Sequence, residues 1–231
     1  MAIGDSLFLH EEIMLLALRD EEGTVASGTM YQYAISGAIL AELLLHNRII
    51  IEQVKRKKLV HVVRTTPLGD PLIDECLEKI TNAKRRSSLQ AWVSRIAQIK
   101  KLKHRVADLL CQRGILRADE DKILLIFTRK IFPEINPEPE TKLIERLREA
   151  IFSDSKNIDP RTVVLISLAH NAGLLKVVFD KKSLKKHKER IEMIIKGELV
   201  GKAAQEAIQA MQAAVMVTCI LPAITATTVS R

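Results

Sequence analysis

The sequence predicts a mainly α-helical fold, a bundle of about eight helices around one central apolar helix, with short β-hairpins. Three observations lead to this prediction. Aromatic residues make up only 3% of the chain and hydrophobic residues 47%, so the core is aliphatic, a composition that favours helices. Apolar residues recur with helical spacing in most segments. The β-branched runs are short and are joined by polar turns.

The first 65 residues predict two helices followed by a hairpin. In "LFLHEEIMLLALRD" the apolar residues Leu9, Ile13 and Leu16 recur with helical spacing, and Gly23 breaks the segment. "YQYAISGAILAELLLHNRIII" is a longer apolar segment that contains Ala38–Leu45, and a helix so poor in charge needs burial among others. "RIIIE" and "KLVHVVRTT" are rich in β-branched residues and flank the basic run "KRKK", which predicts a hairpin with a charged turn.

Capping residues mark the helices that follow. In "TPLGDPLIDECLEKI" a turn leads to Asp70 as the N-cap and Pro71 as the first helical residue. The basic loop "AKRRSS" precedes a helix in "LQAWVSRIAQI". "LKHRVADLLCQRGIL" then predicts a helix that ends at Gly114.

The second half begins with extended residues and returns to helices. "KILLIFTRKIF" has β-branched and aromatic residues on both sides of Thr128, which predicts a second hairpin or a projecting arm. Helices are predicted in "TKLIERLREAIF", "DPRTVVLISLAHNAGLL" and "KKSLKKHKERIEMIIK". A last helix is expected from about Val200 to Leu221. We expect its residues Ala213–Val217 to pack on the central helix, because both segments are poor in charge and need burial.

The length of 231 residues predicts a single domain over residues 1–231. The start "MAIGDSLFLHEE" lacks the cationic end and the apolar run of a signal peptide. The stretch Ala207–Ser230 carries no charge, and its length alone suits a membrane span of about 20 apolar residues. Gln209, Gln212 and Pro222 interrupt this stretch, so we interpret it as a buried core helix.

The net charge of +8 arises from one segment of the chain. Residues Ile51–Arg117 hold 16 Lys and Arg against 6 Asp and Glu, a net of +10, whereas the rest of the chain has a net of −2. Within this segment "QIKKLKHR", from Gln98 to Arg105, has five Lys, Arg or His among eight residues. Such a segment attracts phosphate groups, whichever molecule carries them.

The sequence offers little for catalysis or for a cofactor. It contains no Gly-rich phosphate loop, no Cys-x-x-Cys, no His-Glu-x-x-His and no Gly-x-Ser-x-Gly. Cys76, Cys111 and Cys219 are spaced too widely for a metal site or a disulfide framework, so we expect buried or half-buried thiols in a reducing compartment. His170, inside an apolar helix, is interpreted as a core or capping residue. We therefore expect no enzyme, no cofactor and no metal site.

Five segments follow one another along the chain: "LFLHEEIMLLALRDEEGT", "SGAILAELLLHNRI", "TPLGDPLIDECLEKI", "HRVADLLCQRGIL" and "VVLISLAHNAGLL". Together they resemble the Golgi phosphoprotein 3 family, from about Leu7 to about Leu221. Members of that family are mostly helical single domains with a β-hairpin arm, and they bind phosphatidylinositol 4-phosphate through a shallow basic pocket. In eukaryotes they also hold the cytosolic tails of Golgi glycosyltransferases. The resemblance implies a cytoplasmic protein that is peripheral on a membrane, the Golgi if the source is eukaryotic.

The resemblance also implies site residues. Two basic residues of the family pocket, three positions apart, fall on Lys100 and Lys103, and that spacing would place both side chains on one helical face. A further basic residue and an aromatic residue of the family pocket fall on Ser36 and Ser27. Such a lipid-binding site attracts phosphate by charge rather than by a fixed fork of hydrogen bonds, which favours anionic lipids in general.

The sequence is compatible with more than one kind of binding partner. The first interpretation is a peripheral membrane protein that binds an anionic phospholipid, and the alternative is an adaptor that binds acidic partners or the cytosolic tails of membrane enzymes. Nucleic acid is disfavoured because aromatic residues for stacking are scarce and no DNA-binding motif is present. The resemblance and the apolar stretch at 124–132 further suggest a homo-oligomer joined through that hairpin.

Overall fold

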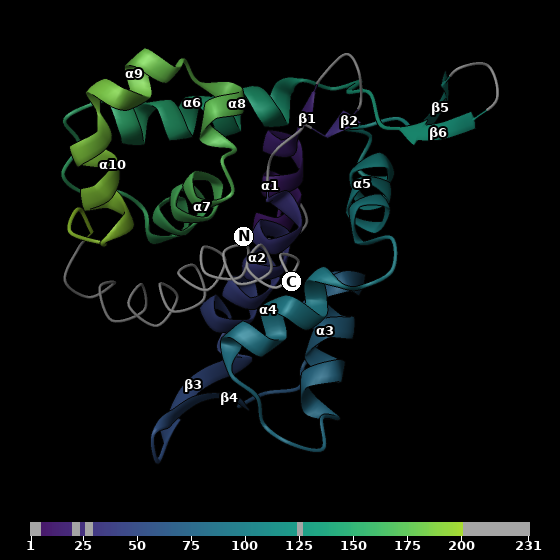
Figure 1. Ribbon diagram of the computed structural model, residues 1–231, viewed down its shortest axis with the longest axis vertical. Coiled ribbons are helices and arrows are strands. Elements are labelled where there is room, and N and C mark those ends of the chain that lie inside the picture. The colour runs from purple at the N-terminus through teal and green to yellow at the C-terminus, as the bar shows by residue number, and fades with distance from the viewer. Residues whose placement is uncertain (1–5, 20–23, 26–29, 124–126, 201–231) are drawn as a thin grey trace, which may run out of the picture.

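The computed structural model describes residues 6–19, 24–25, 30–123 and 127–200, and most of them are helical (Figure 1). The helices are α1 (Leu9–Ala17), α2 (Tyr31–Leu45), α3 (Pro71–Thr81), α4 (Leu89–Ala97), α5 (Leu102–Gln112), α6 (Glu138–Phe152), α7 (Pro160–Asn171), α8 (Leu175–Val178), α9 (Lys181–Lys186) and α10 (Lys188–Ile195). The strands are β1 (Leu18–Arg19), β2 (Thr24–Val25), β3 (Ile49–Val54), β4 (Lys57–Val62), β5 (Asp119–Ile123) and β6 (Phe127–Ile131), paired in order as three antiparallel hairpins. The predicted mainly α fold with short hairpins is confirmed.

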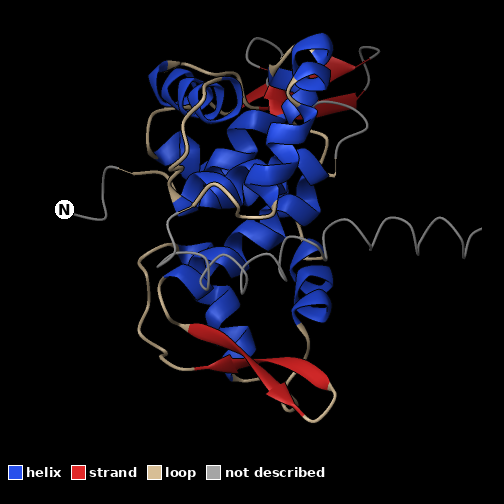
Figure 2. Ribbon diagram, turned by 90° about the vertical axis from the view of Figure 1, so that its left-hand side faces the viewer, coloured by secondary structure: helices blue, strands red, loops and turns tan. Residues whose placement is uncertain are grey.

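The central apolar helix that the sequence predicts is α2. Every residue from Ala34 to Leu43 is buried. A helix buried on all sides needs neighbours around it, and α1, α3, α4 and α7 pack against α2. Figures 1 and 2 show the helices between two hairpins, with β3–β4 at one end of the molecule and β5–β6 at the opposite end.

The β3–β4 hairpin forms where the sequence predicts it. Its register pairs Ile49 with Val62 and Val54 with Lys57, so "KRKK" supplies the turn and the start of β4. Ile49 and Val60 are buried and hold the hairpin on the core. The Val60 N–H also donates to the Ser87 carbonyl at 2.9 Å, which fixes the loop between α3 and α4 beside β4.

The β5–β6 hairpin is also confirmed, but its first strand begins earlier than the apolar run suggests. Residues Asp119–Ile123 form β5 and residues Phe127–Ile131 form β6. At the base of the hairpin Phe132 is fully buried, and Lys130 Nζ lies 2.8 Å from Asp108 Oδ1 on α5. Figure 1 shows the hairpin projecting from the helices. Association of copies through this hairpin stays a prediction.

The described residues hold ten helices rather than about eight. One added helix is the short α8, and another arises because the predicted helix "KKSLKKHKERIEMIIK" divides at His187 into α9 and α10. The His187 ring packs edge-on against Phe152, with centroids 5.0 Å apart, and its Nδ1 lies 2.9 Å from the Ser183 carbonyl oxygen. These contacts hold the ring inward at the point where the helix changes direction. The predicted last helix and its packing on α2 lie outside the described residues, apart from Val200.

Polar residues of α1 enter the core and meet distant partners there. His10 is buried with its Nε2 3.4 Å from Asp70 Oδ2, the N-cap of α3. Glu11 is buried as well, and its Oε1 accepts a hydrogen bond from Arg113 Nε at 2.8 Å. These contacts join the first helix to α3 and to the end of α5.

Arg161 on α7 lies between two buried carboxylates. Its Nη1 is 2.7 Å from Glu42 Oε1 on α2, and its Nη2 is 3.8 Å from Glu12 Oε2 on α1. The same Nη2 donates to the Leu7 carbonyl at 2.6 Å, and Arg146 on α6 donates to Glu12 at 2.8 Å. Buried charges are stable only when they are paired in this way.

Candidate functional site

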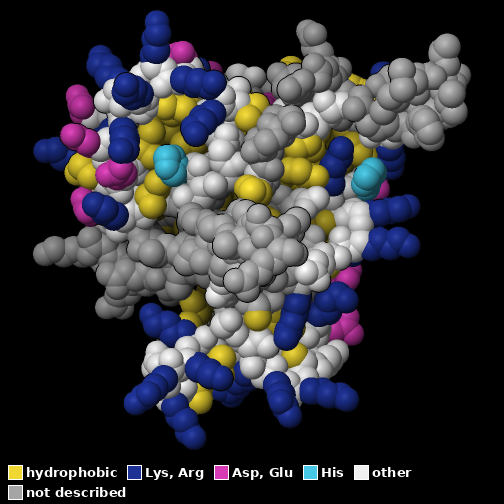
Figure 3. Space-filling model, viewed as in Figure 1, with side chains coloured by type: hydrophobic (Ala, Val, Ile, Leu, Met, Phe, Trp, Pro, Cys, Tyr) yellow, Lys and Arg dark blue, Asp and Glu magenta, His cyan; other side chains and the backbone are white. Residues whose placement is uncertain are grey.

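The basic excess of residues 51–117 lies on the surface, mostly without acidic partners. Figure 3 shows Lys and Arg side chains gathered around the end of the molecule formed by β3, β4 and the α3–α4 loop. Among the described residues, ten exposed cations of this segment have no carboxylate partner. We call these ten the basic surface: Lys55, Arg56, Lys57, Lys58, Arg64, Lys84, Arg85, Arg95, Lys100 and Lys101.

A shallow hollow of about 270 Å³ lies at this end of the molecule, between β4, α3 and α4. Arg86, His61 and Trp92 are among the residues that line it. The Arg95 guanidinium lies 4.7 Å from the centre of the Trp92 ring, and Arg86 pairs with Glu52. Sequence patterns did not indicate the hollow. The one available signal was that Trp92 is the only tryptophan of the chain.

The motif "QIKKLKHR" crosses from α4 to α5 instead of lying within one helix. Lys100 is exposed in the turn between them, and α5 begins only at Leu102. Lys101, which lies between Lys100 and Leu102, has φ 58° and ψ 29°, a left-handed conformation that changes the direction of the chain. Lys103 is half-buried in the first turn of α5. The prediction that Lys100 and Lys103 share one helical face is therefore wrong.

The start of α5 is strongly positive. Asp70, Ser88 and Asp159 cap α3, α4 and α7 through their side chains, whereas the N-cap of α5 is Lys101 and makes no such bond. The first turn of α5 contains no acidic residue, although a helix N-terminus carries partial positive charge and favours anions.

The titration of the neighbouring histidine reflects this charge. Partial burial first, and then the positive charges of Lys103, Lys130 and Lys101, hold the pKa of His104 below its ordinary value, and Asp108 only partly offsets them. An anion at this turn would meet backbone N–H groups and several cations together.

The two serines predicted to belong to the site have different outcomes. Ser36 is fully buried one turn into α2, and its hydroxyl donates to the Gln32 carbonyl at 2.8 Å. It therefore presents no surface to a lipid head group, because the bundle covers this side of α2. Ser27 lies outside the described residues.

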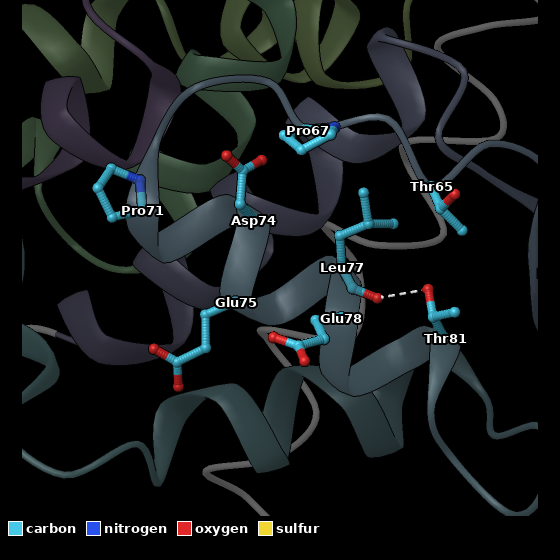
Figure 4. A pocket seen from close by; sticks show the side chains of 8 residues that line it. All are labelled: Thr65, Pro67, Pro71, Asp74, Glu75, Leu77, Glu78 and Thr81. Carbon is cyan, nitrogen blue, oxygen red and sulfur yellow. Dashed lines mark hydrogen bonds between the residues drawn. The ribbon is translucent and has the colours of Figure 1, made fainter.

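A concavity of about 420 Å³ beside α3 has the opposite charge (Figure 4). Asp74, Glu75 and Glu78 lie along it on α3. The Asp74 carboxylate accepts the Leu68 N–H at 2.7 Å and so fixes the loop before α3. A hydrogen bond from Arg105 is the main reason why the pKa of Glu75 is lowered. This concavity repels phosphate, so it is not the anion site.

The two described thiols and His170 show no arrangement for catalysis among the residues that the structure describes, and Cys219 lies outside them. Burial raises the pKa of the Cys76 thiol to about 12 and also raises that of the half-buried Cys111. His170 was predicted to be a core or capping residue; it is exposed in the last turn of α7, so the core alternative is wrong and its position is that of a residue at the end of the helix. Within the described part of the chain, no group of His, Cys, Asp or Glu is placed to hold a metal ion.

Among the helices that the structure describes, none is both long enough and apolar enough to cross a membrane.

Comparison with known proteins places most of the chain in one family. Residues 9–211 match the family model described as Golgi phosphoprotein 3 (GPP34). The chain is also similar to the vacuolar protein sorting-associated protein 74 of Eremothecium gossypii, with 24% identity over 205 residues. That alignment covers 75% of this chain and 61% of the relative, so the chain spans about three fifths of the relative's length. The matched residues include the whole basic surface.

Proposed function

We propose that this chain, which belongs to the Golgi phosphoprotein 3 family, is a peripheral membrane protein that binds anionic phospholipid through its basic surface. The family is Golgi-associated, is known for phosphoinositide binding and adaptor roles, and is not a class of enzymes. The observation that carries the proposal is that ten exposed cations have no carboxylate partner among the described residues. By contrast, Arg113, Arg146 and Arg161 are paired with buried glutamates.

The expected strength suits reversible binding to a membrane. Each Lys or Arg near an anionic bilayer contributes about 1 kcal/mol, and this attraction fades beyond about 8 Å at physiological salt. Only the cations closest to the bilayer act at once, so a handful of them would give useful but reversible adsorption.

The start of α5 is our proposed site for the lipid phosphate. Lys100 and Lys103 flank the N-terminus of α5, whose N-cap Lys101 makes no side-chain cap, and backbone N–H groups there would add hydrogen bonds to the attraction between charges. A phosphoinositide such as phosphatidylinositol 4-phosphate brings more charge than phosphatidylserine and would bind there more strongly. Since Ser36 is buried, no basic side chain from that position closes around the head group, so we propose a general preference for anionic lipids.

Liposome flotation tests the proposal. We expect the protein to float with phosphatidylcholine vesicles that contain phosphatidylserine or phosphatidylinositol 4-phosphate, matched in total charge, and not with phosphatidylcholine alone. The variant Lys100→Glu/Lys103→Glu changes the local charge by four units and should lose about 3 kcal/mol, or about a hundredfold in binding, at low salt. The control Lys182→Glu/Lys186→Glu makes the same change on exposed lysines of α9 and should float like the wild type.

Two results would contradict this proposal, one for the position of the lipid site and one for the kind of partner. If the Lys100→Glu/Lys103→Glu variant floats as well as the wild type, the start of α5 is not the lipid site. If charged vesicles bind no better than neutral ones while a DNA gel shift is strong, the basic surface serves nucleic acid. Circular dichroism of each variant establishes that its fold is intact.

A further inference from the structure

A second region of the molecule combines positive charge with an apolar cavity. The cavity of about 560 Å³ lies between the end of α7 and helices α8, α9 and α10. Figure 3 shows hydrophobic side chains at this corner of the molecule, with Lys and Arg side chains around them and Asp and Glu side chains along the outer edge. None of its lining residues belongs to the basic surface of residues 55–101.

The wall of the cavity is aliphatic. Leu175 on α8 is 2% exposed and Ile191 on α10 is 3% exposed, and both line the cavity together with the half-buried Leu184 on α9. Gly173, with φ 77°, turns the chain from α7 into α8 and has no atom within 4 Å of the position that a Cβ would take. The turn therefore leaves this side of the cavity open.

The rim of the cavity is cationic. Lys176, Lys181, Lys185 and Lys188 are exposed and line it. Lys188 Nζ lies 3.7 Å from Glu192 Oε1, whereas the other three ammonium groups have no carboxylate partner among the residues described. The rim therefore keeps a positive charge of about three.

The sequence explains why charge and apolar surface meet here. In "KKSLKK" the spacing i, i+3 and i+4 places Lys181, Leu184 and Lys185 on one face of α9. The break at His187 then turns α10 so that Lys188 and Ile191 line the same cavity. The two helices together therefore supply both lysines and aliphatic side chains to the cavity.

We propose that this cavity binds a single-chain anionic amphiphile, with its aliphatic chain against Leu175, Leu184 and Ile191 and its anionic head among Lys176, Lys181 and Lys185. Charge complementarity selects an anion over a cation, because three ammonium groups without carboxylate partners would repel a positive head. The aliphatic wall selects a chain over a free phosphate ion. The volume is within the range of about 300–1,000 Å³ that is usual for small-ligand sites.

Chain length provides a quantitative signature. Burial of one methylene group strengthens binding by about 0.8 kcal/mol, which is about fourfold in the dissociation constant. Two added methylenes should therefore tighten binding about fifteenfold as long as the cavity has room for them. Attraction of the head alone would give the same affinity for every chain length.

Isothermal titration calorimetry of the full chain with octyl, decyl and dodecyl phosphate tests the proposal, with each ligand kept below its micelle concentration. We expect the dissociation constant to fall about fifteenfold from each member to the next. Inorganic phosphate should bind far more weakly, and dodecyltrimethylammonium should not bind. Equal affinity across the series, or equal binding of the cationic amphiphile, would overturn the proposal.

Matched variants assign the binding to the cavity. Lys181→Glu/Lys185→Glu should weaken every alkyl phosphate at least tenfold and keep the dependence on chain length. Lys182→Glu/Lys186→Glu makes the same charge change on the same helix, but neither residue lines the cavity, so binding should change by about threefold or less. Leu184→Ser should flatten the dependence on chain length.

Equal losses of affinity in the two lysine double variants would show that the charge of α9 acts without the cavity. The Lys182→Glu/Lys186→Glu variant is also the control for flotation. Ligand binding is measured by calorimetry and membrane binding by flotation, so failure of this inference is distinguishable from failure of membrane binding.

Discussion

Replacing Arg161 by Met removes the group that stands between the carboxylates of Glu12 and Glu42. Arg161 is 26% exposed, whereas Glu42 is 0% exposed. After the replacement, the partners that remain to the Glu42 carboxylate among the described residues are the Leu9 N–H at 2.7 Å and His46 Nε2 at 3.4 Å. The variant therefore contains a buried charge without a full ion pair, the arrangement that destabilises proteins most strongly.

The burial of Glu42 sets how much the free energy of unfolding falls in Arg161→Met. Removing one partner of a buried ion pair costs about 3–5 kcal/mol of stability. Because Arg161 is partly exposed, solvent screens the pair, and we expect a loss at the low end of this range, about 3 kcal/mol. The free energy of unfolding of a domain is typically about 5–15 kcal/mol, so this loss is a large fraction of the total. For a chain of this length it corresponds to a fall in melting temperature of about 6–12 °C.

Urea unfolding followed by circular dichroism measures the effect of Arg161→Met. Burial by itself would raise the pKa of Glu42, but His46, the charge of Arg161 and the Leu9 N–H outweigh burial and lower it. Since protonation removes the buried charge, the deficit of Arg161→Met should be largest at pH 7 and should shrink toward pH 4. The double variant Glu42→Gln/Arg161→Met should recover about half of the loss.

The matched control is Arg85→Met, an exposed arginine without a carboxylate partner among the described residues, and it should change stability by less than about 0.5 kcal/mol. A loss below about 1 kcal/mol for Arg161→Met, or no difference between pH 4 and pH 7, would refute the reasoning.

Three other predictions concern stability and assembly. Burial, the largest influence, raises the pKa of Glu12 despite Arg146 and Arg161, so the stability that its protonated form provides in acid is lost as the pH rises through the raised pKa. Urea midpoints should therefore show that Glu12→Gln is less harmful at pH 7 than at pH 4, whereas Glu42→Gln is more harmful at pH 7, and parallel profiles would contradict this. Asp70→Ala removes the cap of α3 and should cost about 1–2 kcal/mol in the same assay, more than Asp70→Asn, which keeps a capping oxygen. Replacing residues 121–129 by a short turn should lower the sedimentation coefficient if copies join through the β5–β6 hairpin, and an unchanged value would count against that contact.

Local signals in the sequence predicted most of the helices and hairpins. Asp70 and Pro71 mark the start of α3, where Asp70 accepts hydrogen bonds from the Leu72 and Ile73 N–H groups. The division between α9 and α10 was not predictable in this way, because "KKSLKKHKERIEMIIK" has a continuous helical pattern. The break accompanies a contact between His187 and Phe152, which lies in an earlier helix. A sequence window contains no information about such a contact.

The candidate site was predictable in composition and not in geometry. The basic excess of residues 51–117 is visible in the sequence, but the spacing of Lys100 and Lys103 indicated one helical face only if the helix continued through Lys101. The left-handed conformation of that residue leaves no periodic signal. The buried ion pairs were equally invisible, because Glu11 and Arg113 are separated by 102 positions and Glu12 and Arg146 by 134.

The two cationic regions differ in what lies beneath the charge, and this difference predicts how each responds to salt. The basic surface attracts phosphate mainly by charge, so flotation should weaken steeply as the Debye length falls from about 10 Å at 0.1 M salt to about 3 Å at 1 M. In the cavity, the contact of an alkyl chain with Leu175 and Ile191 is not screened, and sulfate or phosphate salts strengthen apolar burial. Sulfate and phosphate are themselves anions that would compete for the lysines, so sodium chloride is the better titrant. Between about 0.1 M and 1 M ionic strength we expect flotation to be nearly abolished, while the affinity for dodecyl phosphate falls by less than about tenfold. If both fall in parallel, the cavity attracts only the anionic head, and the assignment of the chain to Leu175, Leu184 and Ile191 is wrong.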